Sequence, residues 1–313
     1  MLTPAKLDLS SIALPVLEAA VAAAAACQEW VGRGDKHAAD HAAVEAMREA
    51  LGRVPGSGVV VIGEGEKDAA PMLFAGEKVG AGGGPSFDVA VDPLEGTTLC
   101  ATGVPGAVTV VAASPPGTMR PLAGFYMDKI VVGSHARGCI DIDAPIEENL
   151  RTVAVSAGAA VGRLRVAVLR KPRHAELIAR IRAAGASVVE IPDGDVMAGL
   201  SALVPGSGVD LAVGVGGSPE GVLTACAARL LGGDMQARPA PQTDGERDRL
   251  RDAGQLGDRY EAADLVAADD GVFAASAVTG CELLRGPRSG PEGLVVHSIL
   301  VRRGDALRIR SAA

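Results

Sequence analysis

Short apolar runs alternate with helical segments in the second half of the chain, and this pattern most constrains the fold. Apolar runs at 165–169 and 187–191 flank a helical pattern at 174–185, and a third run at 209–215 precedes a helical pattern over about 219–231. Strands that alternate with helices in this way are typical of a mainly parallel sheet covered by helices. The pattern therefore predicts an α/β fold.

The first half of the chain predicts a second and larger sheet. Helical patterns at 11–31 and 39–51 come first, and most of the strand candidates that follow have no helix between them. These strands are expected at 59–62, on both sides of the glycine-rich segment 80–85, at 107–113 and at 129–132. We predict a hairpin turn at 80–85, because the segment lacks the GK[ST] ending of a phosphate-binding loop.

The change of rhythm between the two halves predicts two domains. We place an α+β domain that carries a metal site at 1–155 and an α/β substrate-binding domain at 156–313. The first would contain a mixed sheet and the second a smaller, mainly parallel sheet. Residues 236–260 are charged and contain prolines, which predicts a surface excursion.

Composition excludes several classes of partner. Aromatic residues make up 2% of the 313 residues, so a base-stacking surface for single-stranded nucleic acid is not expected. The net charge of −8 argues against a general polyanion-binding surface. With 48% hydrophobic residues the chain can bury a large core, which must consist mainly of Val, Leu, Ile and Ala. Nucleic acid is therefore not an expected partner.

Cysteine usage and the N-terminus predict a cytoplasmic protein. The five cysteines are scattered and form no CxxC, which is typical of reduced thiols. The N-terminus lacks a signal-peptide pattern. The most apolar helical stretch, 19–27, is too short to span a bilayer, so no membrane association is expected.

Carboxylates follow the predicted strands and indicate a metal site. Asp92 and Glu95 stand in VDPLEGTT (91–98), directly after the apolar run FDVAV (87–91). Further carboxylates at strand or helix ends are Asp40, Glu64, Glu66 and Glu220. If these segments converge, the all-oxygen donor set predicts Mg²⁺ or Mn²⁺. Such ions suit displacement at phosphorus, because they stabilise both the attacking and the leaving oxygen.

The residues after Glu95 can serve a phosphate. Gly96, Thr97 and Thr98 are expected to open a helix or tight turn, whose N–H groups can receive a phosphate. A hydroxyl close to a metal-bound carboxylate can also orient a water molecule for attack. Thr97 is the better candidate for this role.

Each carboxylate also has a simpler interpretation. Glu220 follows Ser218 and Pro219, a good N-cap and N1 pair, so it could merely complement a helix dipole. Asp40 could be a helix N-cap, and the glutamates at 64 and 66 could lie in a solvated turn. The VDPLEGTT stretch is harder to dismiss, because a plain turn needs no paired acids after a buried strand.

The segments after two later strands offer polar groups for a phosphorylated sugar. Lys171 and Arg173 in KPRH could clamp a phosphate, or the segment could be a solvated loop. Asp193 and Asp195 in PDGD could bind sugar hydroxyls, or form a plain turn. The five histidines have no metal-like spacing and are expected to be structural or exposed.

Taken together, these stretches resemble the class II fructose-1,6-bisphosphatases of bacteria, within the superfamily of lithium-sensitive, metal-dependent phosphatases. The resemblance covers about residues 30–235 and fades beyond. It is carried by GRGDKHAAD (32–40), IGEGEKDAAPML (62–73), VDPLEGTT (91–98), YMDKIVVG (126–133), KPRH (171–174), IPDGDV (191–196) and GVGGSPEG (214–221).

The resemblance implies a layered α/β/α/β/α fold and a role for each motif residue. The implied metal ligands are Asp40, Glu64, Asp92, Glu95 and Glu220. The implied catalytic residues are Thr97, which would help activate water, with Asp68 and Glu66. The implied substrate-binding residues are Glu95, Gly96, Thr97, Tyr126, Lys171, Arg173, Asp193, Gly194, Asp195, Gly217 and, as a weaker candidate, Lys36.

These implications favour one function over several alternatives. The expected reaction is Mn²⁺- or Mg²⁺-dependent hydrolysis of the 1-phosphate of fructose 1,6-bisphosphate, a step of gluconeogenesis, in a homodimer or homotetramer. Another sugar or cyclitol phosphate, such as sedoheptulose 1,7-bisphosphate, is an alternative substrate. A non-catalytic paralogue that binds sugar phosphates is a further alternative. A nucleotide-dependent kinase is disfavoured, because the sequence lacks a Walker A motif.

Overall fold

A computed structural model describes residues 9–63, 65, 72–291 and 293–313. The helices are α1 (Ala13–Ala26), α2 (Lys36–Leu51), α3 (Thr97–Thr102), α4 (Ile146–Ser156), α5 (Ala175–Ala183), α6 (Val196–Leu203), α7 (Ser218–Leu231), α8 (Asp244–Asp252) and α9 (Ala262–Leu265). The strands are β1 (Gly56–Ile62), β2 (Lys78–Gly82), β3 (Ser86–Glu95), β4 (Val108–Ser114), β5 (Tyr126–Val132), β6 (Arg165–Leu169), β7 (Ser187–Ile191), β8 (Leu211–Gly217), β9 (Asp234–Pro239), β10 (Tyr260–Glu261), β11 (Val272–Ala277), β12 (Arg288–Gly290), β13 (Gly293–Arg302) and β14 (Asp305–Ala312).

The strands form two mixed sheets. The larger sheet has eight strands in the order β12-β13-β11-β4-β3-β1-β2, and β14 pairs with β13. Only β1 and β3 run parallel among these pairs. The smaller sheet has six strands in the order β10-β9-β5-β8-β6-β7. It is mixed as well, because β6 runs parallel to β7 and β8 while β5 and β9 pair antiparallel. The strands on which a parallel arrangement was predicted, β6, β7 and β8, are parallel, but the antiparallel β5, β9 and β10 make the smaller sheet as a whole mixed rather than mainly parallel.

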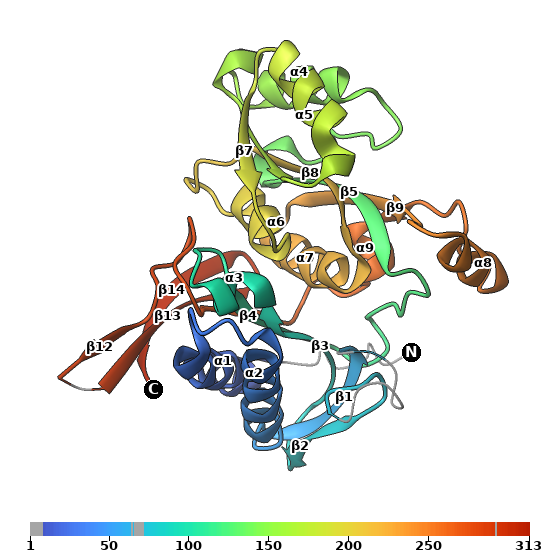
Figure 1. The fold of residues 1–313 in the computed structure, drawn as a ribbon. Helices are drawn as coiled ribbons and strands as arrows, with labels where there is room; N and C mark the ends of the chain where they lie inside the picture. The colour runs from blue at the N-terminus through green and yellow to red at the C-terminus, as the bar shows by residue number, and fades with distance from the viewer. Residues whose placement is uncertain (1–8, 64, 66–71, 292) are drawn as a thin grey trace.

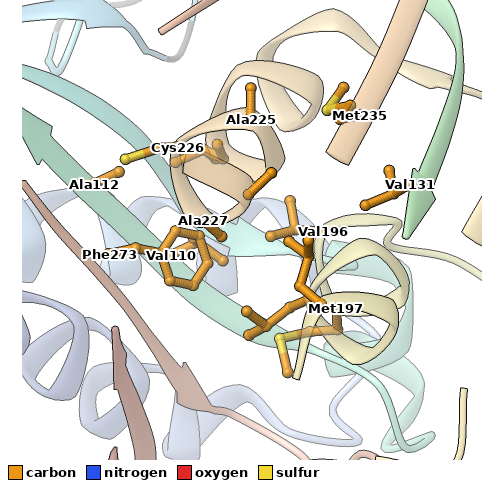
Figure 2. Close-up of a cluster of buried hydrophobic side chains, with 14 of the residues drawn as sticks. Val110, Ala112, Val131, Val196, Met197, Ala225, Cys226, Ala227, Met235 and Phe273 are labelled. Carbon is orange, nitrogen blue, oxygen red and sulfur yellow. The ribbon is translucent and has the colours of Figure 1, made fainter. Parts of the chain in front are cut away.

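Helices and sheets alternate in five layers, which confirms the predicted α/β/α/β/α arrangement (Figure 1). The helices α1 and α2 cover the outer face of the larger sheet. Next to its inner face, α6 and α7 pack between the two sheets, and Figure 2 shows buried apolar side chains from these layers clustered together. The helices α4 and α5 cover the far face of the smaller sheet. Val, Leu, Ile and Ala dominate these cores, as the composition predicts.

Sheet membership does not follow the sequence halves. The smaller sheet begins at β5, before residue 155, and strands β11 to β14 return to the larger sheet. The division into domains at residue 155 stays a prediction. Residues 236–260 are more than a surface excursion, because Ala237 on β9 and Leu250 on α8 are buried.

The glycine-rich segment 80–85 is not a hairpin turn. It connects β2 to β3, and β1 lies between these two strands in the sheet. Gly80 has a φ of +97°, and a Cβ there would lie 2.4 Å from the carbonyl oxygen of Gly56. The glycine therefore permits the close approach of two backbone segments rather than a tight reversal.

The first helical run agrees closely with the pattern predicted at 11–31, but it is long enough to raise the question of a membrane span. Helical turns flank α1, so that Ser10–Trp30 forms a run of 21 residues with a mean hydropathy of 1.7. By length and composition alone this run could cross a membrane. The argument that the apolar stretch is too short to span a bilayer is therefore wrong. In the fold, 56% of its most apolar window is buried, and it packs against α2 and the larger sheet as a core helix.

Candidate active site

A cleft of about 870 Å³ lies where the ends of β3, β5 and β8 meet. The lining also includes residues from α2, from the segments after β6 and β7, and from α8. Nearly all predicted site residues in the described part of the chain line it, namely Asp40, Asp92, Glu95, Gly96, Thr97, Tyr126, Lys171, Arg173, Asp193, Gly194, Asp195, Gly217 and Glu220. The fold thus brings together segments that are up to 180 residues apart, from 40 to 220.

Glu95 and Glu220 are the most unusual carboxylates of the cleft. Glu95 is 4% exposed, and its Oε1 accepts a hydrogen bond from the backbone N–H of Val196 at 2.8 Å. The Oε2 atoms of Glu95 and Glu220 are buried without a hydrogen-bond partner among the described residues. Burial raises the pKa of both groups, and the charge of Asp195 raises each pKa further. Such a pair is costly unless a cation joins it.

One cation is a buried lysine that the sequence reasoning missed. Lys129 lies on β5, is 5% exposed, and its Nζ is 2.7 Å from Oδ2 of Asp195. The same Nζ donates a hydrogen bond to the carbonyl oxygen of Gly217 at 2.8 Å. Its charge lowers the pKa of Glu95 and of Glu220, against the dominant effect of burial. The signal was present, because a lysine in the apolar strand YMDKIVVG requires a partner.

Glycines leave room for these carboxylates. A Cβ on Gly216 would lie 1.7 Å from Oδ2 of Asp195, and a Cβ on Gly217 would lie 1.8 Å from Oε2 of Glu220. The side chain of Glu95 lies against Gly194, which has a φ of +77°. The glycines around PDGD and GVGG are therefore required by the space that the acids occupy.

The end of β3 delivers Asp92 and Thr97. Oδ1 of Asp92 accepts a hydrogen bond from the N–H of Leu94 at 3.1 Å, which shapes the chain around Pro93. The helix α3 begins at Thr97, after Gly96 with a φ of +80°, as the expected helix opening requires. Thr97 lines the cleft, whereas Thr98 is exposed and does not. The structure thus separates the two threonines as predicted.

The helices α2 and α7 begin differently from their expected caps. Asp35 is the N-cap of α2, where it accepts hydrogen bonds from the N–H groups of His37 and Ala38. Asp40 lies one turn later and faces the cleft, so its interpretation as an N-cap is wrong. Gly217 rather than Ser218 is the N-cap of α7, which places Glu220 in the first turn. Burial raises the pKa of Asp40.

The KPRH segment forms the cationic part of the cleft. Nζ of Lys171 is 2.9 Å from Oδ1 of Asp193. Nη2 of Arg173 donates to the carbonyl oxygen of Val215 at 2.8 Å, and its guanidinium group lies 5.5 Å from the ring centroid of Tyr126. Lys171 and Asp193 are about one third exposed, so a ligand can compete for both.

His174 ties this segment to β8. Its Nδ1 lies 2.7 Å from the carbonyl oxygen of Leu169, and its Nε2 accepts a hydrogen bond from the N–H of Val215 at 2.8 Å. These contacts require the neutral ring with the proton on Nδ1. Desolvation lowers the pKa of His174, and the charge of Arg173 lowers it further. The expectation of a structural histidine is confirmed here.

The cleft also has residues that no motif indicated. Glu246 on α8 is 7% exposed and lines the cleft, and one of its carboxylate oxygens accepts a hydrogen bond from the N–H of Gln242. Phe125 lines the cleft, and the guanidinium group of Arg249 lies 4.5 Å from its ring centroid. The charged composition of 236–260 concealed these contacts, because it is also typical of a solvated loop.

Four of the predicted site residues are not among the described residues that line the cleft. Glu64, Glu66 and Asp68 are outside the residues that the structure describes. Lys36 is the first residue of α2, is exposed, and does not line the cleft.

The donor set fits a hard divalent cation. In the described ranges, no three His, Cys, Asp or Glu side chains come together as a metal site by themselves. Nevertheless, two buried carboxylate oxygens lack a partner, and the other acids of the cleft offer oxygen alone. Oxygen ligands are those that Mg²⁺ and Mn²⁺ prefer.

Comparisons with known proteins find relatives along nearly the whole chain. The sequence profile of the family described as "Bacterial fructose-1,6-bisphosphatase, glpX-encoded" matches residues 10–312. The chain is 43% identical over 303 residues to the "Fructose-1,6-bisphosphatase class 2" of Haemophilus influenzae, covering 92% of this chain and 91% of that protein. It is 41% identical to the "Fructose-1,6-bisphosphatase 1 class 2" of Escherichia coli K12, covering 92% and 90%. The motifs alone had suggested that the similarity fades after residue 235, but the family profile matches up to residue 312.

Proposed function

The chain belongs to the bacterial, glpX-encoded fructose-1,6-bisphosphatases, and we propose that its acidic cleft hydrolyses the 1-phosphate of fructose 1,6-bisphosphate. The enzyme is thus a phosphatase, and its products would be fructose 6-phosphate and inorganic phosphate, as gluconeogenesis requires. One observation above all supports this placement. Buried, unpartnered carboxylate oxygens of Glu95 and Glu220 lie in the same cleft as Lys171 and Arg173.

The enzyme is metal-dependent, and we infer that the acidic residues of the cleft bind the metal. The ligands would be Asp40, Asp92, Glu95 and Glu220, together with Glu64 outside the described residues. Mg²⁺ or Mn²⁺, when bound, supplies positive charge that stabilises the attacking and leaving oxygens of a phosphoryl transfer. The fit is supported by the oxygen-only donor set and by the burial that, together with the charge of Asp195, raises the pKa values of Glu95 and Glu220.

The other residues of the cleft position the water and the substrate. The Thr97 hydroxyl would orient the attacking water, with Asp68 and Glu66 as further catalytic candidates. Lys171 and Arg173 would bind the second phosphate, since their cationic groups reach the cleft. The sugar would contact Gly96, Tyr126, Asp193, Gly194, Asp195 and Gly217.

The sugar-binding aspartates are already engaged within the protein. Asp193 pairs with Lys171, and Asp195 pairs with the buried Lys129. The half-exposed Asp193 pair can open to a ligand, whereas the buried Asp195 pair serves to hold the end of β8 in place. We further propose that the enzyme acts in the cytoplasm as a homodimer or homotetramer.

Replacing Thr97 tests the proposed function. We expect Thr97→Ala to lower kcat about 100-fold or more, the usual contribution of a group that helps transfer a proton or position water, with little change in KM. The measurement is phosphate release from fructose 1,6-bisphosphate by the purified chain with Mg²⁺ or Mn²⁺. Thr98→Ala is the matched control, because Thr98 is adjacent but exposed and outside the cleft lining.

Two results would contradict this proposal. If folded Thr97→Ala keeps the kcat of the wild type, Thr97 has no role in the reaction. If the wild type prefers sedoheptulose 1,7-bisphosphate or an inositol phosphate in a substrate panel, the assigned substrate is wrong although the cleft remains a phosphatase site.

A further inference from the structure

A second pocket has a volume of about 860 Å³ and is lined by other residues than the cleft. Its lining contains four arginines and is strongly positively charged. It is formed by residues 281–285 and by parts of β12, β13 and β14. We call it the basic pocket, and its arginines, Arg285, Arg288, Arg308 and Arg310, the pocket arginines. These strands project from the body of the molecule in Figure 1. No residue that lines the basic pocket also lines the cleft.

Strand register places the charges on one face of the sheet. His297 on β13 pairs with Arg310 on β14, and Ile299 pairs with Arg308. On the other side of β13, Val295 pairs with Arg288 of β12. Directly paired residues in antiparallel strands point to the same face, and so do residues two apart. The pocket arginines of three segments are thus gathered over His297 by the topology itself.

This gathering of like charge is not neutralised within the described chain. Within residues 9–63, 65, 72–291 and 293–313, no carboxylate lies within 4.0 Å of a pocket arginine nitrogen. Among the described residues of the lining the one carboxylate is that of Glu282, which lies 4.0 Å from Arg165 instead. Nε of Arg308 donates a long hydrogen bond, 3.4 Å, to the carbonyl oxygen of Leu283.

Three of the pocket arginines lie close enough to His297 to affect its pKa. Desolvation lowers its pKa, and guanidinium charges lower it further, from Arg310, Arg285 and Arg288. Arg288 on β12 and Arg308 and Arg310 on β14 flank β13 on one face, so their like charges repel one another, in a protein whose net charge is −8. The stability of the fold does not account for this arrangement, but an anionic ligand would.

The chemistry of the lining favours phosphate groups. Guanidinium groups bind phosphate oxygens bidentately, so several arginines around one pocket suit several phosphate oxygens. The pocket has the size of a small-molecule site. In the part of the chain that the structure describes, no Phe, Tyr or Trp lines it, and its apolar lining is Leu283, Leu284, Pro291, Val295 and Ile309. A stacked nucleobase is therefore not what it recognises.

We propose that the basic pocket is a second ligand site, separate from the cleft, which binds a small molecule that carries two or more phosphate groups. Its position also offers a connection to the cleft. A third cavity, of about 430 Å³, is lined both by residues 280–283, beside the basic pocket, and by Asp193 and Gly194 of the cleft. A ligand that orders residues 281–285 can therefore act on the sugar-binding segment.

Calorimetric titration with inorganic pyrophosphate tests the proposal. The full-length chain is loaded with Mg²⁺, and the same free Mg²⁺ concentration is kept in cell and syringe. We expect two binding events, one in each site. Arg288→Ala/Arg310→Ala should weaken one event at least tenfold, and Arg173→Ala should weaken the other. Arg302→Ala is the matched control, since Arg302 lies on β13 outside the pocket lining.

The outcomes separate the alternatives. Basal phosphatase activity of Arg288→Ala/Arg310→Ala should stay unchanged, and its thermal unfolding midpoint should not fall, because repulsion is relieved. Unchanged pyrophosphate binding by this variant would overturn the proposal, as would loss of all binding in Arg173→Ala. Light scattering after gel filtration gives a further test. A smaller assembly of the double variant would overturn the proposal, because it would mean that a second copy of the chain covers this face.

Discussion

At the residue scale, Gly217 leaves the space that the Glu220 carboxylate fills. We expect Gly217→Ala to lower kcat at least tenfold, because its Cβ would lie 1.8 Å from Oε2 of Glu220 and displace it. The φ of −69° suits alanine, so the backbone itself is not strained. Steady-state phosphate release measures the effect. Gly245→Ala is the control, because nothing lies within 4 Å of its Cβ. Full activity in Gly217→Ala would mean that the position of Glu220 is not critical.

Lys129 and Asp195 form a buried ion pair whose removal should be costly. We expect Lys129→Met to lower the free energy of unfolding by about 3–5 kcal/mol, because an unpaired carboxylate remains buried beside two others. Urea denaturation measures the loss. In Lys129→Met/Asp195→Leu the loss should be smaller than the sum of the single losses. Additive losses would show that the two residues do not stabilise each other.

At the element scale, His174 fastens the short helical turn Pro172–His174 to β8. A lowered pKa in the fold means that the unfolded chain binds a proton first as the pH falls. This contribution to stability is therefore present above the ordinary histidine pKa of about 6.5 and is lost as the pH falls below it.

Replacing His174 with a residue that does not titrate should remove this dependence. We expect the free energy of unfolding of the wild type to fall more steeply between pH 7 and pH 5 than that of His174→Asn. The variant can keep the bond to Leu169 but cannot gain the charge. Denaturation at several pH values checks this. Equal slopes in both proteins would assign the pH dependence to other groups.

At the scale of the whole molecule, the cleft joins the ends of both sheets, so its charge affects the complete fold. Removing divalent cations should lower the thermal unfolding midpoint, because Glu95 and Glu220 then stay buried beside the charge of Asp195, with only Lys129 to offset the repulsion. A ligand present at 100 times its Kd stabilises a fold by about 2.7 kcal/mol. The measurement is calorimetry with Mg²⁺ and after chelation.

A variant with fewer carboxylates gives the control for this prediction. In Glu220→Gln one of the two buried charges is absent, so the difference between the Mg²⁺-loaded and the chelated protein should shrink. If chelation leaves the unfolding midpoint of the wild type unchanged, metal binding in the cleft does not stabilise the fold.

Much of the fold and the site could be predicted because it depends on local order in the sequence. Apolar periodicity indicated most helices and strands, since burial of one face imposes a period on the residues themselves. The carboxylates at the end of β3 and in α7 were recognisable, because acids beside apolar strands have few purely structural reasons to be there. Thr97 could be preferred over Thr98 because it is closer to Glu95 in the sequence.

Only the tertiary structure decided which of these elements meet. β5 pairs with β8 and β9 rather than with its neighbours in the sequence, and β11 to β14 return to the first sheet. Such pairings arise from long-range hydrogen bonds and packing, which leave no period in the sequence. The partnership of Lys129 with Asp195, the place of Glu246 in the cleft and the gathering of the pocket arginines all follow from these pairings. Charges in one chain therefore acquire their partners only when the sheets have formed.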